Sequence, residues 1–402
     1  MKHLYPPDEV LDVQTARRVG YSTAARRWRL LRVVMVTTLL VAVGACGSSY
    51  ATPSSSAGAP SATPSTTPSA SYTSTVAPTP SGTATSSPTA TASPAGQYAD
   101  LDGLLTTPAL AHRLPIAVMI DDLNVARPQA GLSTASIVYQ SPANGGVDRY
   151  MVIYQEGESS DIGPVRSTRQ YFAKWASEYH AMLSHYGSDA RSTSTLLPAL
   201  TKQGAIYDLD GLAGAGGAYH RISARPAPHN VYTSSATLML WRAKMGYPAT
   251  FAGVPMRPFA DDLPLDQRPA SGSITVPYRG QTIGYTYDRS TDSYLRYING
   301  KAQIDSANGR QVVARNVIVL FQSITTDMQQ GDNYLEPIVG QIGKGDALVF
   351  RDGQAITATW QKKSDTDLTR LYDSSGQQIT LVRGEIFIQV VTLGTKVSHK
   401  AG

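Results

Sequence analysis

The stretch Pro115-Ile-Ala-Val-Met-Ile-Asp121 is an apolar run of strand length that ends on a carboxylate. Short runs rich in Val, Ile and Tyr between turn residues are typical of buried strands. Similar runs follow at Ser136–Gln140 and Val147–Gln155, and another lies at Ala205–Leu209. These runs predict a sheet that begins near residue 115.

Helical patterns alternate with these expected strands. Arg169–His180 carries a stripe of aromatic and alanine side chains at helical spacing, and Ser235–Met245 follows hydroxyl residues suited to an N-cap. An alternation of strands and helices is typical of α/β architecture. We therefore expect an α/β domain over residues 98–265.

The second half of the chain has a different texture, with short β-like runs and no clear helical pattern. These runs are Ser273–Pro277, Thr282–Tyr287, Tyr294–Ile298, Asn316–Gln322, Ala347–Arg351, Ile356–Gln361 and Glu385–Val391. Asn-Gly and Asp-Gly pairs, as at Asn299-Gly300 and Asp352-Gly353, favour hairpin turns. We expect a smaller, mostly β domain over residues 266–402.

The N-terminal region has the features of an export signal. Residues 33–45 are uncharged and apolar, follow a cluster of arginines, and are too few to span a bilayer comfortably. The segment ends Val43-Gly44-Ala45-Cys46, which resembles the lipobox of bacterial lipoproteins. That resemblance implies that residues 1–45 are a cleaved lipoprotein signal peptide and that Cys46 is lipidated, with fatty acyl chains such as palmitate. The alternative is an ordinary buried cysteine.

A low-complexity linker is expected after the lipid-anchor cysteine, over residues 46–97. None of the 51 residues from 47 to 97 is charged, and 47 of them are Ser, Thr, Pro, Ala or Gly. Such a segment cannot bury enough apolar surface to offset the entropy of ordering it. We expect a disordered tether that lifts the folded part away from a membrane; O-glycosylation is a further reading of the same composition.

Charge and cysteine content exclude several classes of protein. The 35 Lys and Arg residues against 30 Asp and Glu give a net charge of +5, but residues 1–32 alone hold seven basic and three acidic residues. The rest of the chain is nearly neutral, which argues against nucleic acid as a partner. The single cysteine excludes a disulfide framework and a cysteine-based zinc site.

No standard catalytic signature is present, so the sequence favours a non-catalytic protein over an enzyme. The glycine-rich segment 211–217 lacks a following lysine and reads as a loop rather than a phosphate cradle. Residues 98–265 contain ten arginines and three lysines. Because the guanidinium fork matches phosphate and carboxylate, this bias is compatible with an anion site.

The first candidate anion site lies at the start of the expected aromatic helix. Arg166, Ser167 and Arg169 follow one another there, and a helix N-terminus favours anions. Ser167 is also a candidate N-cap. The alternative is that the arginines pair with surface carboxylates and serve only the structure.

The remaining candidate ligand-binding residues come from three other segments: Asp121, Arg149, and the group Arg221, Arg225, His229 and Asn230. His229 suits a general acid or a ligand because its charge changes near neutral pH, although locking a loop is an alternative role. Asp121, Asp122 and Asp210 follow expected strands, where they could hold Mg²⁺ against a bound pyrophosphate or simply form turns.

Several motifs resemble those of the YerB-type bacterial lipoproteins, a family with an N-terminal domain of unknown function and a C-terminal β domain. The similar segments are residues 115–121, 126–132, 137–139, Gly145-Gly146 with Arg149, 162–169, 208–211 and 227–230, then 316–319, 343–350 and 356–360. The chain departs from the family at Asp122, where the family has Asn, and at Gln140, where the family has an acidic residue. If that acidic residue were catalytic, this chain would be impaired.

The resemblance implies an envelope lipoprotein on the outer face of the cytoplasmic membrane, with peptidoglycan or the cell-wall machinery as further partners. Our main hypothesis is that the α/β domain binds an anionic, phosphate-bearing envelope ligand through the arginines. One alternative is a non-catalytic scaffold for wall-synthesis proteins. The other is a phosphotransferase on lipid-linked precursors, by a looser analogy with the LytR-CpsA-Psr enzymes. A ligand site requires the arginines to converge, and a scaffold predicts them dispersed and paired.

Overall fold

The structure is a computed structural model that describes residues 96–251, 253, 257–328 and 335–400. The expected signal peptide, Cys46 and nearly all of the expected linker lie outside the described residues. The folded region, residues 87–402, is one compact unit. Its first described strand, β1 (Gln97–Tyr98), pairs with β2 (Leu105–Thr106), so regular structure begins at the last residue of the expected linker.

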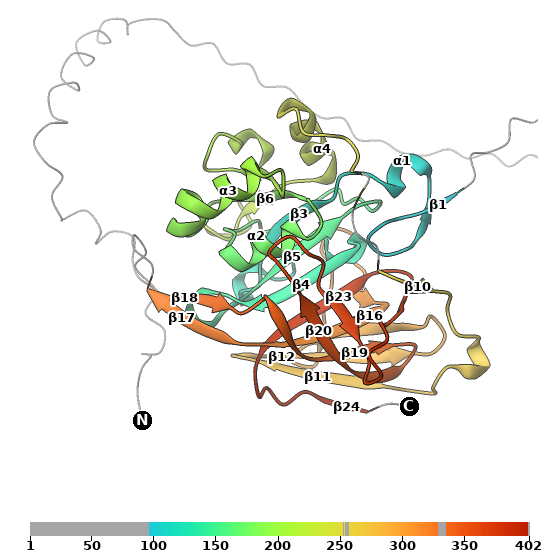
Figure 1. Cartoon of the computed structure of the whole chain (residues 1–402). Helices are drawn as coiled ribbons and strands as arrows, with labels where there is room; N and C mark the ends of the chain where they lie inside the picture. The colour runs from blue at the N-terminus through green and yellow to red at the C-terminus, as the bar shows by residue number, and fades with distance from the viewer. Residues whose placement is uncertain (1–95, 252, 254–256, 329–334, 401–402) are drawn as a thin grey trace, which may run out of the picture. The chain divides into compact units, whose positions relative to one another are not determined.

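A ten-stranded sheet forms the centre of the folded unit (Figure 1). Its strands, in spatial order, are β21 (Arg370–Tyr372), β20 (Gln354–Lys362), β19 (Gly343–Arg351), β16 (Asn316–Gln322), β23 (Ile386–Thr392), β4 (Ile137–Pro142), β5 (Asp148–Tyr154), β3 (Ile116–Asp121), β6 (Met182–His185) and β7 (Tyr207–Asp210). Most of them coincide with strands expected from the sequence. The exception in the first half is β6, a short strand that contains Ser and His.

A smaller six-stranded sheet packs against the central one. It contains β11 (Ser273–Tyr278), β12 (Gln281–Asp288), β13 (Ser293–Ile298), β14 (Lys301–Ala302), β15 (Val313–Ala314) and β24 (Ser398–Lys400). The expected hairpin at Asn299-Gly300 joins β13 to β14, and the one at Asp352-Gly353 joins β19 to β20. Short pairs complete the β structure: β8 (His220–Arg221) with β9 (Val231–Tyr232), β10 (Phe259–Ala260) with β22 (Leu381–Val382), and β17 (Ile324–Met328) with β18 (Leu335–Val339).

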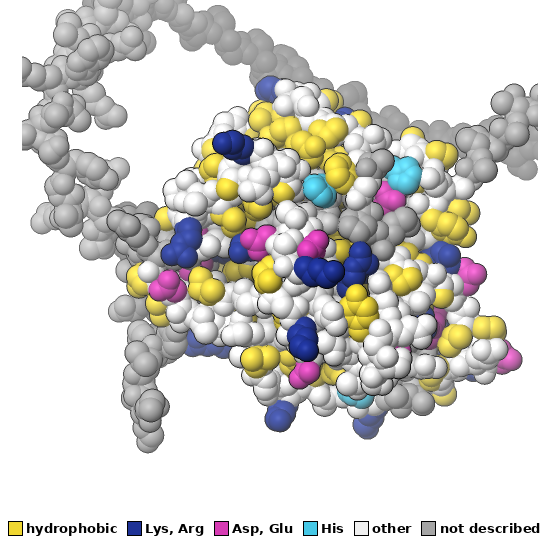
Figure 2. Space-filling view, in the orientation of Figure 1, with side chains coloured by type: hydrophobic (Ala, Val, Ile, Leu, Met, Phe, Trp, Pro, Cys, Tyr) yellow, Lys and Arg dark blue, Asp and Glu magenta, His cyan; other side chains and the backbone are white. Residues whose placement is uncertain are grey.

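The expectation of an α/β first half is not confirmed, because the described chain is mostly β. Its α-helices are short: α1 (Pro108–Ala111), α2 (Gln170–Ser177), α3 (Leu197–Lys202) and α4 (Ser235–Lys244). Among the strands of the first half, β3, β6 and β7 form the one consecutive parallel set that the described residues contain, while β3, β5 and β4 pair antiparallel. Hydrophobic side chains gather over α4 in Figure 2, where Leu240 is 72% exposed.

The central sheet joins the two halves of the chain. Parallel pairing of β23 with β4 places Ile386 opposite Ile137 and Gln389 opposite Gln140. The expected boundary between residues 265 and 266 therefore does not separate two sheets. The second half also does not close a sandwich or barrel of its own, because β16, β19, β20, β21 and β23 belong to the shared sheet.

Each face of the central sheet covers its own core. On one face, Met119 and Met151 pack with the aromatic side chains of α2, including Trp175, which stacks on Tyr139 with ring centroids 5.0 Å apart. On the other face, Ile120 and Tyr150 pack with residues of the six-stranded sheet. Successive side chains of a strand point to opposite faces. This alternation decides where the polar residues at the strand ends lie.

Candidate functional site

Polar residues collect at one edge of the central sheet. Asp121, His185 and Asp210 are the last residues of the parallel strands β3, β6 and β7, while Asp148 and Arg149 begin the antiparallel strand β5 beside Asp121. The carboxyl ends of parallel strands are where ligands usually bind in α/β sheets. The candidate residues of the first half therefore lie along one edge.

Alternation along the strands divides this edge between the two faces of the sheet. Asp121 and Arg149 follow the register of the face that α2 covers, and Asp148 follows that of the opposite face. Asp122, next in the chain after Asp121, bonds to Gln281 of the six-stranded sheet. Two groups of polar side chains result, one on each face.

The first group, here termed the arginine cluster, consists of Asp121, Arg149, Arg166, Arg169 and His229. Asp121 is 1% exposed, and its Oδ2 accepts a hydrogen bond of 2.6 Å from His229 Nδ1. The same oxygen lies 3.2 Å from Arg166 Nε. Arg166 and His229 keep 22% and 15% of their side-chain surfaces exposed. The cluster therefore faces solvent through one guanidinium and one imidazole.

Arg149 and Arg169 lie beneath that surface. Arg169 forms an ion pair with Glu336 of β18, with 2.9 Å between Nε and Oε2, and its Nη1 donates to the Thr168 carbonyl at 2.6 Å. Arg149, which is 5% exposed, donates from Nη1 to the Ser167 carbonyl at 2.8 Å. Within the described part of the chain, no carboxylate forms an ion pair with Arg149.

The electrostatics of the cluster follow from this arrangement. Burial, followed by the nearby charges of Arg169 and Arg166, lowers the pKa of Arg149 to about 9. Among the described residues, the carboxylates that form ion pairs with this cluster are those of Asp121 and Glu336. An excess of buried positive charge is costly unless a counter-ion is present. The arrangement suits an anion that contacts several guanidinium groups.

The structure does not bring every candidate residue into the cluster. The N-cap of α2 is Arg169 and not Ser167, as had been expected. The Ser167 hydroxyl instead donates to the Tyr186 carbonyl at 3.0 Å. Arg221 donates to Asn230 Oδ1 at 2.6 Å and lies over the Tyr186 ring. Arg225 donates to backbone carbonyls of the loop at 125–128. The side chains of Ser167, Arg221 and Arg225 thus form hydrogen bonds within the loops and not with residues of the arginine cluster.

Asp210 and the glycine-rich segment have structural roles. Asp210 Oδ1 accepts from the backbone N–H groups of Gly187 and Leu212, as a turn residue does. A Cβ at Gly211 would lie 2.3 Å from the Tyr186 ring, so close packing requires glycine there. Asp121 and Asp122 bond to partners on different faces and do not form a joint Mg²⁺ site. Over the described ranges, no three His, Cys, Asp or Glu side chains group as metal ligands.

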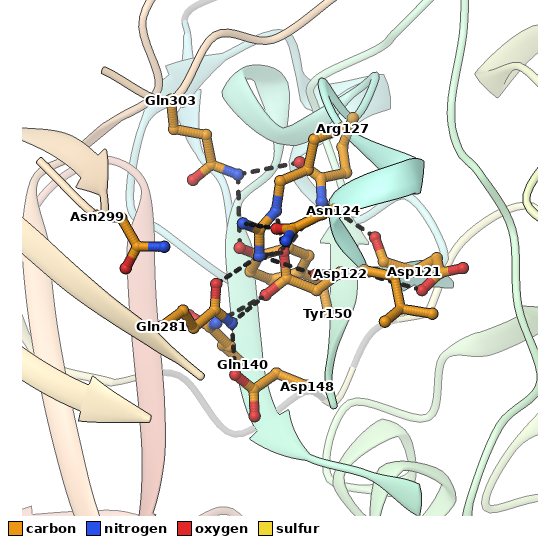
Figure 3. Close-up of polar contacts among 12 residues, drawn as sticks. Asp121, Asp122, Asn124, Arg127, Gln140, Asp148, Tyr150, Gln281, Asn299 and Gln303 are labelled. Carbon is orange, nitrogen blue, oxygen red and sulfur yellow. Dashed lines mark hydrogen bonds and ion pairs between the residues drawn. The ribbon is translucent and has the colours of Figure 1, made fainter. Parts of the chain in front are cut away.

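The second group, here termed the amide–carboxylate network, lies on the other face (Figure 3). Gln281 Nε2 donates to Asp122 Oδ2 at 2.8 Å and to Asp148 Oδ2 at 2.5 Å. Gln140 Nε2 donates to the same Asp122 oxygen at 3.0 Å, and Arg127 Nη2 donates to Asp122 Oδ1 at 2.8 Å. The network thus ties two strands of the central sheet to β12.

Burial controls the protonation of the two aspartates. It raises the pKa of Asp122, and burial together with the charge of Asp122 raises the pKa of Asp148 to about 7. Two carboxylates that share one amide donor cannot both ionise cheaply. Burial and the mutual repulsion of the two carboxylates thus both favour the protonated form of Asp148.

The departures at Asp122 and Gln140 lie in one contact. Gln140 and Asp122 hydrogen-bond each other directly, with Gln140 Nε2 donating to Asp122 Oδ2. One acid and one amide form this contact.

Three residues of the second half, Arg296, Gln281 and Glu336, also contact these two groups. Arg296 is fully buried and donates to Gln140 Oε1 at 2.5 Å. Gln281 and Glu336 lie outside the expected β-like runs, and the structure places them in β12 and β18. Only their pairing with distant strands makes them part of these sites.

Comparisons with known proteins agree with the fold. Residues 101–247 match the N-terminal domain, and residues 274–388 the C-terminal domain, of the protein of unknown function DUF3048. The chain is 29% identical over 299 residues to YerB of Bacillus subtilis (strain 168), which is named as a lipoprotein; the match covers 73% of this chain and 86% of YerB.

The crystal structure of the Bacillus subtilis YerB protein resembles this fold. Its TM-score is 0.65 at 24% sequence identity, and the match covers 76% of this chain and 99% of that one. At this identity the structural match supports the fold alone. None of the helices in the described residues is long and apolar enough to cross a membrane. The chain, which is homologous to the lipoprotein YerB and contains both DUF3048 domains in order, belongs to the DUF3048 family.

Proposed function

We propose that this protein is a lipid-anchored component of the cell envelope whose folded part binds a phosphate-bearing anion at the arginine cluster. The observation that supports the proposal most strongly is the environment of Arg149. Its guanidinium is buried and hydrogen-bonds a backbone carbonyl, with two further arginines nearby and no carboxylate partner among the residues that the structure describes.

A phosphate group suits this environment for two reasons. It carries more negative charge than a carboxylate, and Arg149 and Arg166 have one carboxylate, Asp121, beside them among the described residues. Its oxygens also accept several guanidinium hydrogen bonds at once. His229 adds a partly exposed imidazole at the same surface, with its Nδ1 oriented by Asp121. Arg166 and His229 would contact the ligand first, above Arg149.

The binding test measures the thermal stability of residues 87–402 with inorganic phosphate and pyrophosphate, each with and without Mg²⁺. A ligand at one hundred times its dissociation constant should stabilise the folded state by about 2.7 kcal/mol. The double variant Arg166→Ala/Arg169→Ala should lose this shift. Arg310→Ala, which removes an exposed arginine outside the cluster, should keep it. Absence of a shift with every anion would overturn the proposal in favour of a scaffold.

The anchoring part of the proposal places the protein on the outer face of the cytoplasmic membrane through Cys46. The supporting observations are the lipobox-like sequence and the homology to a protein named as a lipoprotein. Cys46→Ala should release the full chain from the membrane fraction of a bacterial host, because a thioether-linked lipid requires the thiol. Ser48→Ala is the matched control and should remain bound. Retention of Cys46→Ala would contradict lipidation.

A further inference from the structure

An open cavity of about 540 Å³ lies where the loop at residues 124–129 meets the β13–β14 hairpin. It borders the amide–carboxylate network, and none of the five residues of the arginine cluster lines it. Asn124 and Arg127 line one side, and Asn299, Lys301 and Gln303 line the other. The cavity is therefore a separate candidate binding site, formed by residues from both halves of the chain.

Gln303 lines this cavity, and the acceptor of its amide lies buried behind the cavity wall without a donor. The side chain is 5% exposed, and its Nε2 donates to Gln129 Oε1 at 3.2 Å and to the Tyr150 hydroxyl at 3.4 Å. Gln129 Nε2 in turn donates to Asp122, which fixes the orientation of both amides. Gln303 Oε1 is left buried without a donor, on the side of Asn299 in Figure 3. A buried acceptor without a donor is costly, and a ligand hydroxyl would satisfy it.

The positive charge that lines the cavity suits a ligand with a single anionic group. Asp122 neutralises Arg127, whose Nε and Nη2 lie 3.1 and 2.8 Å from Asp122 Oδ1. Lys301 is exposed and forms no ion pair with any residue in the described ranges. One uncompensated ammonium matches one carboxylate. A phosphate dianion would find more compensation at the arginine cluster.

The remaining wall of the cavity is aliphatic. Ile298, Ala302 and Ile304 line it together with Pro128, and none of the lining residues that the structure describes is aromatic. The cavity therefore lacks a surface for stacking a planar ring and instead offers an apolar wall to C–H groups. A pyranose has such a C–H face together with hydroxyl donors.

We propose that this cavity binds a sugar acid, a pyranose that carries one carboxylate. The ligand carboxylate pairs with Lys301 Nζ, a ring hydroxyl donates to Gln303 Oε1, and the C–H face packs on Ile298 and Ile304. Asn124 and Asn299 border the same space and offer amide groups to the remaining hydroxyls. This site is independent of the anion site proposed at the arginine cluster.

The test titrates D-glucuronic acid into residues 87–402 and follows binding by calorimetry. D-glucose, which carries a hydroxymethyl group in place of the carboxylate, should bind at least about tenfold more weakly, because it loses a charge-assisted hydrogen bond. Acetate, which keeps the carboxylate but lacks the sugar, should also bind at least about tenfold more weakly, because it loses the hydroxyl and apolar contacts. Lys301→Met should weaken glucuronic acid by a similar factor. Lys344→Met, which removes an exposed lysine from β19, should leave binding unchanged.

A second variant separates the hydroxyl contact from the charge contact. Gln303→Met removes the acceptor at similar volume and should weaken glucuronic acid and glucose by the same factor, while pyrophosphate binding stays unchanged. Because Lys301 is exposed, Lys301→Met decides the proposal even if Gln303→Met does not fold. Absence of saturable glucuronic acid binding to the parent protein would overturn the proposal. Equal affinity for the parent and Lys301→Met would also overturn it.

Discussion

Asp121 and Asp122 are adjacent in the chain, but their carboxylates belong to different sites. Asp121 contacts Arg166 and His229 on the face of the sheet that α2 covers. Asp122 contacts Gln140 and Gln281 on the opposite face. Because successive side chains of a strand point to opposite faces, the end of β3 supplies one carboxylate to the arginine cluster and a second carboxylate to the amide–carboxylate network.

Arg149 should lower the free energy of unfolding of the protein when no ligand is bound. Arg149→Met removes a buried charge and its repulsion with Arg166 and Arg169, so the free energy of unfolding should rise by about 1 kcal/mol. Urea denaturation without anions measures the change. Arg166→Met is the matched comparison and should lower the stability, because it removes a cation that pairs with buried Asp121. A decrease for both variants would show that Arg149 is already compensated within the fold.

The carboxyl group of Asp148 should make stability fall as the pH rises. Its pKa is raised from 3.8 to about 7 on folding, so its stabilising contribution is fully present below about pH 4 and is lost as the pH rises through 7. Asp148→Asn should therefore be more stable than the parent above pH 7, with a difference that shrinks on acidification. Denaturation midpoints across this pH range measure it. Asp346→Asn, an exposed change on β19, should give a pH-independent offset; a flat profile for Asp148→Asn would refute the prediction.

At the level of elements, local sequence patterns predict most strands and their hairpins but not their partners. Asn316–Gln322 is a strand in the structure with the expected bounds, because its apolar residues are continuous and the pattern is local. Its pairing with β23 and the pairing of β23 with β4 depend on contacts between distant segments. Glu336 and Gln281 lie in the sites because of such pairings. Local patterns in a single sequence do not predict which distant strands pair.

The predictable part of the site is the part that follows strand ends. The sequence places Asp121 after an apolar run and Arg166 at the start of a helix, and His229 is a candidate for its titration near neutral pH. The structure brings these three residues and Arg149 together. Ser167 was expected at a helix N-cap, but α2 starts later and Arg169 occupies that position. Helix ends are set by backbone geometry within one or two residues, which propensity does not resolve.

The two hairpin turns of the second half provide a matched test of close packing. Gly300 and Gly353 have φ values of 76° and 71°, which L residues adopt at a cost of about 1–2 kcal/mol. A Cβ at Gly300 meets no atom within 4 Å, whereas one at Gly353 would lie 2.6 Å from the Tyr287 ring. Gly353→Ala should therefore lower the free energy of unfolding more than Gly300→Ala, as measured by urea denaturation. Equal losses would mean that Tyr287 moves without cost.

For the whole molecule, the shared sheet makes the two family domains interdependent. β4 pairs with β5 of the first half and with β23 of the second half, so separation at residue 265 exposes strand edges on both sides. Fragments 87–265 and 266–402 should each fail to unfold cooperatively on heating, whereas 87–402 should give one transition. Circular dichroism of the fragments measures this. A cooperative transition in either fragment alone would establish an independent domain.

The central claim is that Arg149 belongs to an anion site, and calorimetric titration of pyrophosphate into residues 87–402 tests it most directly. We predict one saturable site, with affinity at least about tenfold lower in Arg149→Met, because a charge-assisted hydrogen bond is lost from a buried position. Arg310→Met should bind like the parent. Equal affinity in the parent and Arg149→Met, or no binding by the parent, would contradict the claim.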